Sequence, residues 1–434
     1  MSATSAYEMS PLRDLEALKA TTNSRVPSEI MTALESLDSW VESQRFRGWD
    51  PHDALNSPLL RALTLKNRFA AIFWMQLLKR CPLNLRHILG ISQGYNPKGM
   101  GLFLASYARK YAVTRDAQQR DFLIFFIRWL LENAASGFSG MSWGYNFPWP
   151  NRSFFAPEGT PTIVNTAFIG LGFMDLHLLM LQDLDWGSVV GHLRAGTGAK
   201  EYSKVASPLA VSRSACDFIL RDLNVLSQTE GELCFSYTPL DRRAVHNANM
   251  LGAWLLASVF GETDEQRLRT SALASARFTA RRQLSDGSWP YGEASNDRWV
   301  DNFHTGFVLM ALKRVGECTR TDEFRESVLR GYEFWKDRMF LADGCPKYYP
   351  DRIFPIDVHS VAQAILTFLE FRHEDSEAMD RAIQVAQWSL ANLQDSEGYF
   401  YYQIRRAYSI RIPYMRWAQA WMQRALTELA YSHL

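Results

Sequence analysis

The chain has 434 residues, of which 47% are hydrophobic and 21% charged, a balance typical of a globular protein with a large core. The formal net charge of +1 excludes binding to nucleic acid or to an acidic membrane through bulk charge. The five cysteines (Cys81, Cys216, Cys234, Cys318 and Cys345) form no CxxC pair. Their scatter and odd number predict reduced thiols and a cytoplasmic location.

The first 55 residues precede the repeated part of the chain, and we expect them to form an N-terminal helical extension packed on the outside. Their opening stretch lacks the apolar core of a secretory signal. The sequence contains no run of about 18 apolar residues, so we expect no transmembrane segment. Further along, residues 122–131 ("FLIFFIRWLL") are too short to span a bilayer and contain Arg128, so they predict a buried helix.

Three later stretches share one pattern, in which a histidine lies one residue into an apolar run with helical spacing. They contain His246 ("VHNANMLGAW"), His304 ("FHTGFVLMAL") and His359 ("VHSVAQAILT"). Two further stretches fit the same register, with Asn165 and Trp417 at the histidine position. The steps from 246 to 304, 304 to 359 and 359 to 417 are 58, 55 and 58 residues, which indicates an internal repeat.

Each repeat combines an amphipathic stretch, an aromatic loop and an apolar helix. The amphipathic stretches include residues 214–226, 270–284, 326–340 and 382–394, and the loops include residues 142–152, 231–243, 286–302, 343–357 and 397–415. Six such hairpins over residues 56–434 predict an all-α fold, an (α/α)6 toroid with an inner and an outer ring of helices. Its inner helices are expected to begin near Lys98, Val164, Val245, Asn302, Asp357 and Tyr414. An open solenoid is the alternative.

In a closed ring the loops and the inner-helix N-termini share one face, so the repeated position predicts one central pocket. Aromatic rings stack on sugars, while Asp, Asn and Arg bind hydroxyls and carboxylates, which indicates a carbohydrate site. The candidate catalytic residues are His304, His359, Tyr145 and Arg416. The candidate substrate-binding residues are His246, Arg152, Trp149, Glu158, Asn165, Arg243, Trp289, Tyr291, Asp301, Asp357, Tyr349, Tyr402, Arg405, Tyr408 and Trp417.

These residue types suit proton transfer at a uronate. His304 or His359 would be the base, Tyr145 or a tyrosine of "YYQIRRAY" the acid, and Arg416 the cation that stabilises the enolate-like anion. Hydrolysis is an alternative, since Glu158, Asp241, Asp301 and Asp357 could supply a pair of carboxylates. Three histidines with a carboxylate could also hold zinc, but the tight ligand spacing of motifs such as HExxH is missing. We therefore predict no metal and no cofactor.

Several motifs resemble known families. "QLSDGSWPYG" (283–292) resembles the repeat of squalene cyclases and protein prenyltransferases, which are α/α toroids, although the sequence has no DxDD acid motif. "GWDPHDALNS" (48–57), "LNLRHILGI" (83–91), residues 143–168 and "PYMRWAQAWMQRAL" (413–426) resemble an uncharacterised group of toroid proteins that accompany bacterial capsule and exopolysaccharide genes. The Tyr- and Arg-rich loops and the ending "RWAQA" are similar to the catalytic domain of glucuronyl C-5 epimerases and to six-hairpin glycosidases and lyases.

Together these observations predict a carbohydrate-active protein of bacterial polysaccharide biosynthesis or modification, acting as a uronate epimerase or lyase. The alternatives are a glycoside hydrolase and a non-catalytic glycan-binding or scaffold protein; terpene or prenyl chemistry ranks below these. The expected partners are a polysaccharide or oligosaccharide substrate and other proteins of polysaccharide synthesis.

Overall fold

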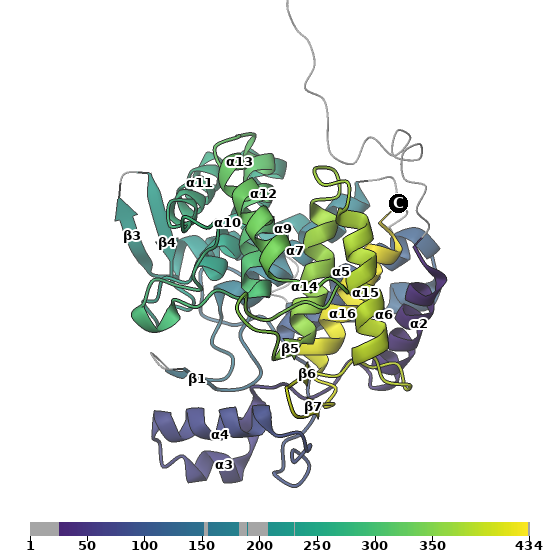
Figure 1. Ribbon diagram of the computed structural model, residues 1–434. Helices are drawn as coiled ribbons and strands as arrows, with labels where there is room; N and C mark the ends of the chain where they lie inside the picture. The colour runs from purple at the N-terminus through teal and green to yellow at the C-terminus, as the bar shows by residue number, and fades with distance from the viewer. Residues whose placement is uncertain (1–25, 152–154, 182–188, 190–206, 230, 433–434) are drawn as a thin grey trace, which may run out of the picture.

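The computed structural model describes residues 26–151, 155–181, 189, 207–229 and 231–432. Its centre is a ring of six helices arranged around one axis (Figure 1). These inner helices are α5 (Pro97–Thr114), α7 (Ile163–Met180), α10 (His246–Thr263), α12 (Asn302–Thr319), α14 (Val358–Glu370) and α16 (Ala420–Ala430). A π-helical turn, η4 (Met415–Gln419), leads into α16. Each predicted inner-helix start lies within one residue of an observed one, counting η4 as the start of the sixth.

An outer ring of helices surrounds the inner one. It consists of α2 (Ser28–Ser43), α6 (Ala117–Glu132), α9 (Pro208–Arg221), α11 (Gln266–Ala280), α13 (Arg325–Arg338) and α15 (Ala378–Leu393). Every inner helix packs against the next, and α16 packs against α5, so the ring closes. The predicted (α/α)6 toroid is therefore confirmed, and the open solenoid is excluded.

Helix α2 lies within the predicted N-terminal extension and packs against α15 and α16. Its buried face contains Ile30, Leu34, Leu37 and Val41. This helix therefore occupies the sixth outer position, beside the last inner helix. The division of the chain into residues 1–55 and 56–434 stays a prediction.

Polar side chains cap the first turns of four of the six inner helices, namely α5, α7, α12 and α14. Asp301 accepts a hydrogen bond from the backbone N–H of His304, and Asp357 accepts one from that of His359. Thr162 and Asn96 cap α7 and α5 in the same way. Such caps satisfy N–H groups that have no partner within the helix, and they hold the N-terminal ends at one face of the ring.

Strands are short and lie mainly in the loops at this face. They pair as β1 (Trp149–Pro150) with β2 (Phe155–Ala156), β3 (Val225–Thr229) with β4 (Glu232–Phe235), and β5 (Ile356–Asp357) with β6 (Gln403–Ile404) and β7 (Ser409–Ile410). All pairs are antiparallel. Two short 3-10 turns, η1 (Asp53–Asn56) and η3 (Ser295–Asp297), complete the loops.

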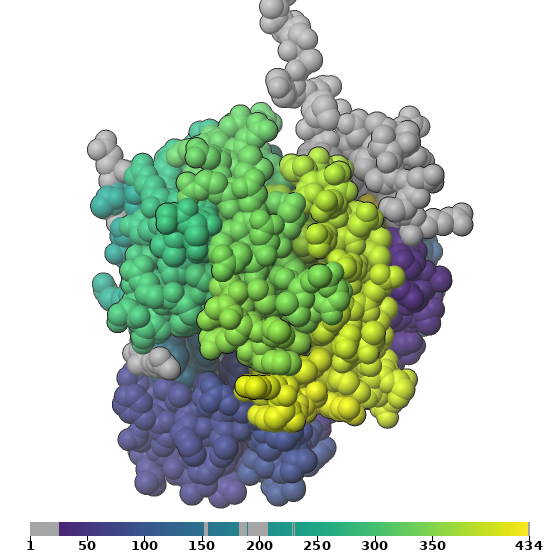
Figure 2. Space-filling view, in the orientation of Figure 1, coloured from purple at the N-terminus to yellow at the C-terminus, as the bar shows by residue number. Residues whose placement is uncertain are grey.

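Two further helices, α3 (Pro58–Leu63) and α4 (Arg68–Arg80), form a lobe below the ring in Figure 1. The lobe packs through Leu60, Met75 and Leu78 onto a second apolar cluster that includes Tyr402 and Tyr414. These two tyrosines come from the loops at the N-terminal ends of the inner helices, the face that we call the mouth of the ring. Figure 2 shows it as the lower part of the molecule, against the loop face of the toroid. We call this unit, residues 57–90, the basal lobe.

Among the described residues, one helix is long and apolar enough to cross a membrane, namely α7, and 72% of it is buried. It packs between α5 and α10 in the inner ring. Its apolar composition is therefore that of a mostly buried core helix.

Candidate functional site

The N-terminal end of the inner helix α12 carries a carboxylate–histidine pair. Asp301, the N-cap of α12, lies 2.6 Å from His304 Nδ1 through its Oδ2 atom, and Trp299 Nε1 donates to the same oxygen over 3.0 Å. The carboxylate is buried, whereas the His304 side chain remains 22% exposed. Asp301 therefore holds Nδ1–H and leaves Nε2 as the nitrogen that can exchange a proton with a substrate.

A cavity of about 10 Å³ adjoins this pair, which is close to the space one water needs. His246, Trp289, Tyr291 and His304 are among its lining residues. The Tyr291 ring lies 4.7 Å from the His304 ring and stacks on Trp299. Burial raises the pKa of Tyr291, so its hydroxyl stays protonated and can act as an acid or hydrogen-bond donor.

His246 and Trp289 reach this cavity while also bonding to their surroundings. His246 Nε2 lies 2.9 Å from Glu293 Oε1, and its Nδ1 lies 3.5 Å from Thr279 Oγ1 on α11. Trp289 Nε1 donates to the Thr279 carbonyl over 3.0 Å. Both side chains therefore already have hydrogen-bond partners, which include Thr279 of the outer helix α11.

His359 lies at the same register position of α14 and is 1% exposed. Aromatic rings surround it, with centroid distances of 4.7 Å to Phe303, 4.7 Å to Trp417 and 4.6 Å to Trp421. Neither ring nitrogen has a hydrogen-bond partner among the described residues. Burial lowers the pKa of His359 well below its ordinary value, aided by the charges of Lys98 and Arg416, so the ring is neutral at physiological pH.

Asn165 repeats this situation on α7. It is fully buried, and its Oδ1 and Nδ2 atoms both lack a partner within the described chain. Buried polar groups without partners are rare in folded proteins and are expected where a ligand or water completes them. Two of the five register positions therefore present unpaired polar atoms in the core.

A buried ion pair joins the last repeat to the loop that precedes the basal lobe. Arg416, in the π-helical turn, binds Asp50 through Nε at 2.6 Å and Nη2 at 2.8 Å, and these two residues are 2% and 4% exposed. Although burial opposes its charge, Asp50 has a pKa far below its usual range because Arg416 lies beside it. The guanidinium expected to face a substrate carboxylate thus has two donors already bound.

The network continues into the basal lobe. His52 Nδ1 lies 3.3 Å from Asp50, and His52 Nε2 lies 3.1 Å from Nζ of Lys79 on α4. Burial and the Lys79 charge lower the pKa of His52 to about 3, and burial lowers the pKa of Lys79 to about 8. The Lys79 ammonium also lies 5.1 Å from the centre of the Trp417 ring.

Tyr145 joins the same cluster. Its ring lies 5.2 Å from the Arg416 guanidinium, and its hydroxyl lies 3.4 Å from that of Tyr237. Burial raises the pKa of both hydroxyls. Trp149 contacts both tyrosine rings, at centroid distances of 5.8 Å and 5.0 Å. Ring contacts therefore connect the four candidate catalytic residues, from His304 through Phe303, His359 and Trp417 to Arg416 and Tyr145.

Lys98, at the start of α5, is a further cation in the core. It is 4% exposed, and its Nζ lies 4.3 Å from the Phe168 ring and 5.0 Å from the Trp421 ring. No ion pair within the described chain reaches it. Burial lowers its pKa well below the usual value, with the Arg416 charge adding to this effect.

Other candidate residues lie around the mouth in mainly local contacts. Asp357 accepts hydrogen bonds from Trp417 Nε1 and Gln403, and Arg243 is paired with Asp297. Tyr402 is buried against Tyr414, whereas Tyr408 is exposed and donates to the Arg80 carbonyl. Arg405 is partly buried, Glu158 is exposed, and Tyr349 lies beneath Arg352. Arg152 lies outside the described residues.

Sequence reasoning missed Asp50, His52, Lys79 and Lys98. A signal for two of them was present, since "GWDPHD" (48–53) combines acids and a histidine with Trp and Pro in one short loop. Lys79 gave no signal, because it looks like an ordinary basic residue at the end of an amphipathic helix.

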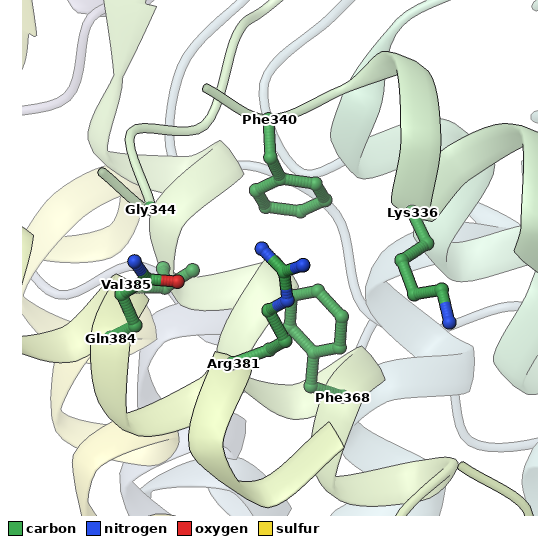
Figure 3. Close-up of a pocket in the computed structure, with 7 residues that line it drawn as sticks. All are labelled: Lys336, Phe340, Gly344, Phe368, Arg381, Gln384 and Val385. Atoms are coloured by element: carbon green, nitrogen blue, oxygen red, sulfur yellow. The ribbon is translucent and has the colours of Figure 1, made fainter. Parts of the chain in front are cut away.

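The described residues hold neither a group of metal ligands nor a second cavity of useful size. Among the described residues, no three His, Cys, Asp or Glu side chains are placed together to hold a metal ion. A second cavity of about 10 Å³ lies elsewhere, between α13, α14 and α15, where Arg381 reaches toward Phe340 and Phe368 (Figure 3). It is far too small for a sugar.

Solved structures share the fold of this chain. A cellobiose 2-epimerase from Bacillus thermoamylovorans matches with a TM-score of 0.56 and 9% identity, over 78% of this chain and 88% of that one. A GH76 α-mannanase from Bacteroides thetaiotaomicron matches with a TM-score of 0.55 and 10% identity, over 79% and 88%. A D-mannose isomerase matches with a TM-score of 0.54 and 12% identity, over 78% and 88%. No family model and no curated protein matches the sequence.

Proposed function

We propose that this protein is a saccharide epimerase or isomerase that moves a proton at the carbon next to a carbonyl or carboxyl group. The observation that carries the proposal is the pair of histidines at equivalent positions of α12 and α14. One is oriented by Asp301, and the other is neutral with both nitrogens unpaired. Toroids of this shape include a cellobiose 2-epimerase and a D-mannose isomerase, and this likeness in fold supports a saccharide substrate.

The reaction we propose uses one histidine to remove the C–H proton and the other to return one. With the neutral His359 as base, an unpaired ring nitrogen takes the proton and an enediolate forms. His304, whose imidazolium Asp301 stabilises through Nδ1–H, returns a proton from Nε2. Tyr291 is protonated and can donate a hydrogen bond to the enediolate oxygen. Return of the proton to the opposite face of the same carbon gives the epimer, and its return to the adjacent carbon gives the isomer.

The narrower proposal of a uronate substrate stays open, but Arg416 is less suited to its carboxylate than the sequence indicated. Asp50 binds two of its donors, so a carboxylate would have to compete with a buried bidentate ion pair. Lys98 is an additional cation near the centre. A role in polysaccharide biosynthesis also stays a proposal.

Hydrolysis has weaker support from the geometry, although a GH76 α-mannanase shares the fold. A glycosidase needs two carboxyl groups that face the glycosidic bond. Asp50 is bound to Arg416, Asp301 to His304 and Trp299, and Asp357 to Trp417 and Gln403. Each central carboxylate is thus engaged in capping or pairing.

The site must open for any sugar to bind, since the cavity beside His304 has a volume of only about 10 Å³. Access therefore requires displacement of side chains that line this cavity, such as Trp289 and Tyr291.

Solvent deuterium exchange tests the proposal. The protein is incubated in D2O with glucose, mannose, cellobiose and glucuronate oligosaccharides, and NMR follows loss of the C–H signal next to the carbonyl or carboxyl carbon. We expect exchange with at least one of them, and a fall of about 10²- to 10⁴-fold in His304→Asn and in His359→Asn.

His373→Asn is the matched control, because this histidine is exposed on the outer surface. Exchange that survives both central substitutions would refute the assignment of the two histidines. Release of new reducing ends without any exchange would replace the proposal with hydrolysis.

A further inference from the structure

The basal lobe carries an unusual concentration of exposed apolar side chains. Eight of the nineteen large hydrophobic residues exposed in the described chain fall within residues 59–88. They are Leu59, Leu63, Leu65, Phe69, Phe73, Leu77, Leu83 and Ile88. The side chains of Leu65 and Ile88 are 86% and 83% exposed, so nearly all of their apolar surface faces water. Patches of this kind on a folded protein mark interaction surfaces.

Helix α4 is apolar on two opposite faces. Ala71, Met75 and Leu78 face inward and are buried. Phe69, Phe73 and Leu77 follow one another at intervals of four residues, which places them on one outer stripe. The neighbouring helix α3 adds Leu59 and Leu63, which are also four residues apart and exposed. The inner face accounts for the fold of the lobe, and the outer face has no partner among the described residues.

The charge around this stripe is of one sign. The sequence contains no aspartate or glutamate from Ala54 to Arg115. Arg61, Lys66 and Arg80 are exposed, and none of them forms an ion pair with a described residue. The Arg68 guanidinium lies 5.5 Å from the Phe69 ring, at the start of the stripe. By contrast, exposed basic residues on the outer ring have acidic partners, as in the pair between Arg277 and Glu323.

We propose that the basal lobe docks on the surface of an anionic lipid bilayer. Exposed aromatic and leucine side chains flanked by unbalanced basic residues are the features of a helix that lies in the membrane interface. Basic residues near such a surface add electrostatic attraction to the apolar contacts. With 13 residues, α4 is too short to span the bilayer, so it would lie along its surface. The net charge of the whole chain is close to zero, so it does not reveal the local excess of basic residues in the lobe.

Vesicle sedimentation tests the proposal with the full chain. The vesicles contain phosphatidylcholine alone or phosphatidylcholine with phosphatidylglycerol, each at low and high salt. We expect binding to the anionic vesicles at low salt, a loss of at least about tenfold with zwitterionic vesicles, and a similar loss at high salt.

Two double variants separate the apolar and the charge contributions. Phe69→Ser with Phe73→Ser should lower binding at least about tenfold. Lys66→Glu with Arg80→Glu should do the same and should remove the salt dependence. All four side chains are exposed, so thermal unfolding should change little. Leu284→Ser with Leu329→Ser is the matched control, since both leucines are exposed outside the lobe and should leave binding unchanged.

Three outcomes would overturn the proposal. The first is the absence of sedimentation with every vesicle. The second is equal binding by wild type, both lobe variants and the control. The third is self-association of the wild type that the Phe69→Ser, Phe73→Ser variant abolishes, without vesicle binding, since the stripe would then be an interface between copies of the chain.

Discussion

Asp301 has two roles that one substitution can separate. It caps α12 through the His304 N–H, and it holds His304 Nδ1 through its other oxygen. Asp301→Asn keeps a good capping side chain, so we expect a loss of stability below about 1 kcal/mol. Proton transfer should fall about tenfold to a hundredfold, because the neutral amide no longer stabilises the imidazolium. Thermal unfolding and deuterium exchange measure the two effects.

Asp357→Asn is the control for this substitution, because Asp357 caps α14 but bonds Trp417 instead of a histidine ring. Equal losses of exchange in both variants would mean that capping, and not the orientation of His304, determines activity.

His52 and His359 predict acid sensitivity of the fold. The folded-state pKa of His52 is about 3, and that of His359 lies well below the ordinary value of about 6.5. Below pH 6.5 the unfolded chain binds protons that the folded chain does not, so the free energy of unfolding falls as pH decreases. The limit is about 1.4 kcal/mol per pH unit for each histidine.

Urea unfolding between about pH 6.5 and 4.5 measures this slope. We expect His52→Gln and His359→Gln each to make it shallower, and the double variant to make it shallower still. Slopes that are the same in all four proteins would contradict the burial of these rings in neutral form.

The histidines of the repeat were predicted from the sequence, whereas Asp50 and His52 were missed. The difference is the distance along the chain between each residue and its partners. The histidine register is a local, repeated pattern and can be read from periodicity alone. Asp50 meets Arg416 across 366 positions, and His52 depends on Lys79 from a segment outside the repeats. Such contacts follow from ring closure and from the basal lobe, which no local pattern encodes.

At the scale of helices, two glycines predict opposite effects of the same substitution. A Cβ atom at Gly331 on α13 would lie 2.4 Å from the Trp289 ring, whereas one at Gly261 on α10 would meet nothing within 4 Å. Gly331→Ala should therefore lower the free energy of unfolding by about 1–3 kcal/mol. Gly261→Ala should raise it by about 0.5–1 kcal/mol, because alanine favours the helix. Urea unfolding of the two variants checks both signs, and stabilisation by Gly331→Ala would show that Trp289 is loosely packed.

Element boundaries were predictable because they rest on short-range chemistry. Caps such as Asp301 and Asp357 directly precede apolar runs, and the observed starts agree with the expected ones. The two helices of the basal lobe were not predicted. They lie between α2 and the first inner helix, α5, where periodicity with the other units is lost.

At the scale of the whole molecule, α2 should contribute to the stability of the ring. Leu37 on its inner face is fully buried, and Glu35 on the same helix is exposed. Leu37→Ala should cost about 2–5 kcal/mol in the global unfolding transition. Glu35→Ala should change it by less than about 0.5 kcal/mol. A Leu37→Ala protein with an unchanged transition would mean that α2 unfolds independently of the toroid.

The closed architecture itself was predictable, because six units of similar length with apolar inner helices have few other ways to bury those faces. Periodicity does not reveal what covers the mouth. The volume available beside His304 depends on how loop side chains such as Trp289 and Tyr291 pack, and hence on contacts that periodicity does not encode.

The pairing of Asp50 with Arg416 also has a consequence for biosynthesis. The two residues are separated by 366 positions, and translation at about 5–20 residues per second makes them about 20–70 s apart in time. For most of that interval Asp50 and Lys98 have been synthesised while Arg416, Trp417 and Trp421 have not. The nascent chain therefore carries an unclosed ring whose central charges lack their partners, and the site can assemble only when the last helix inserts between α14 and α5.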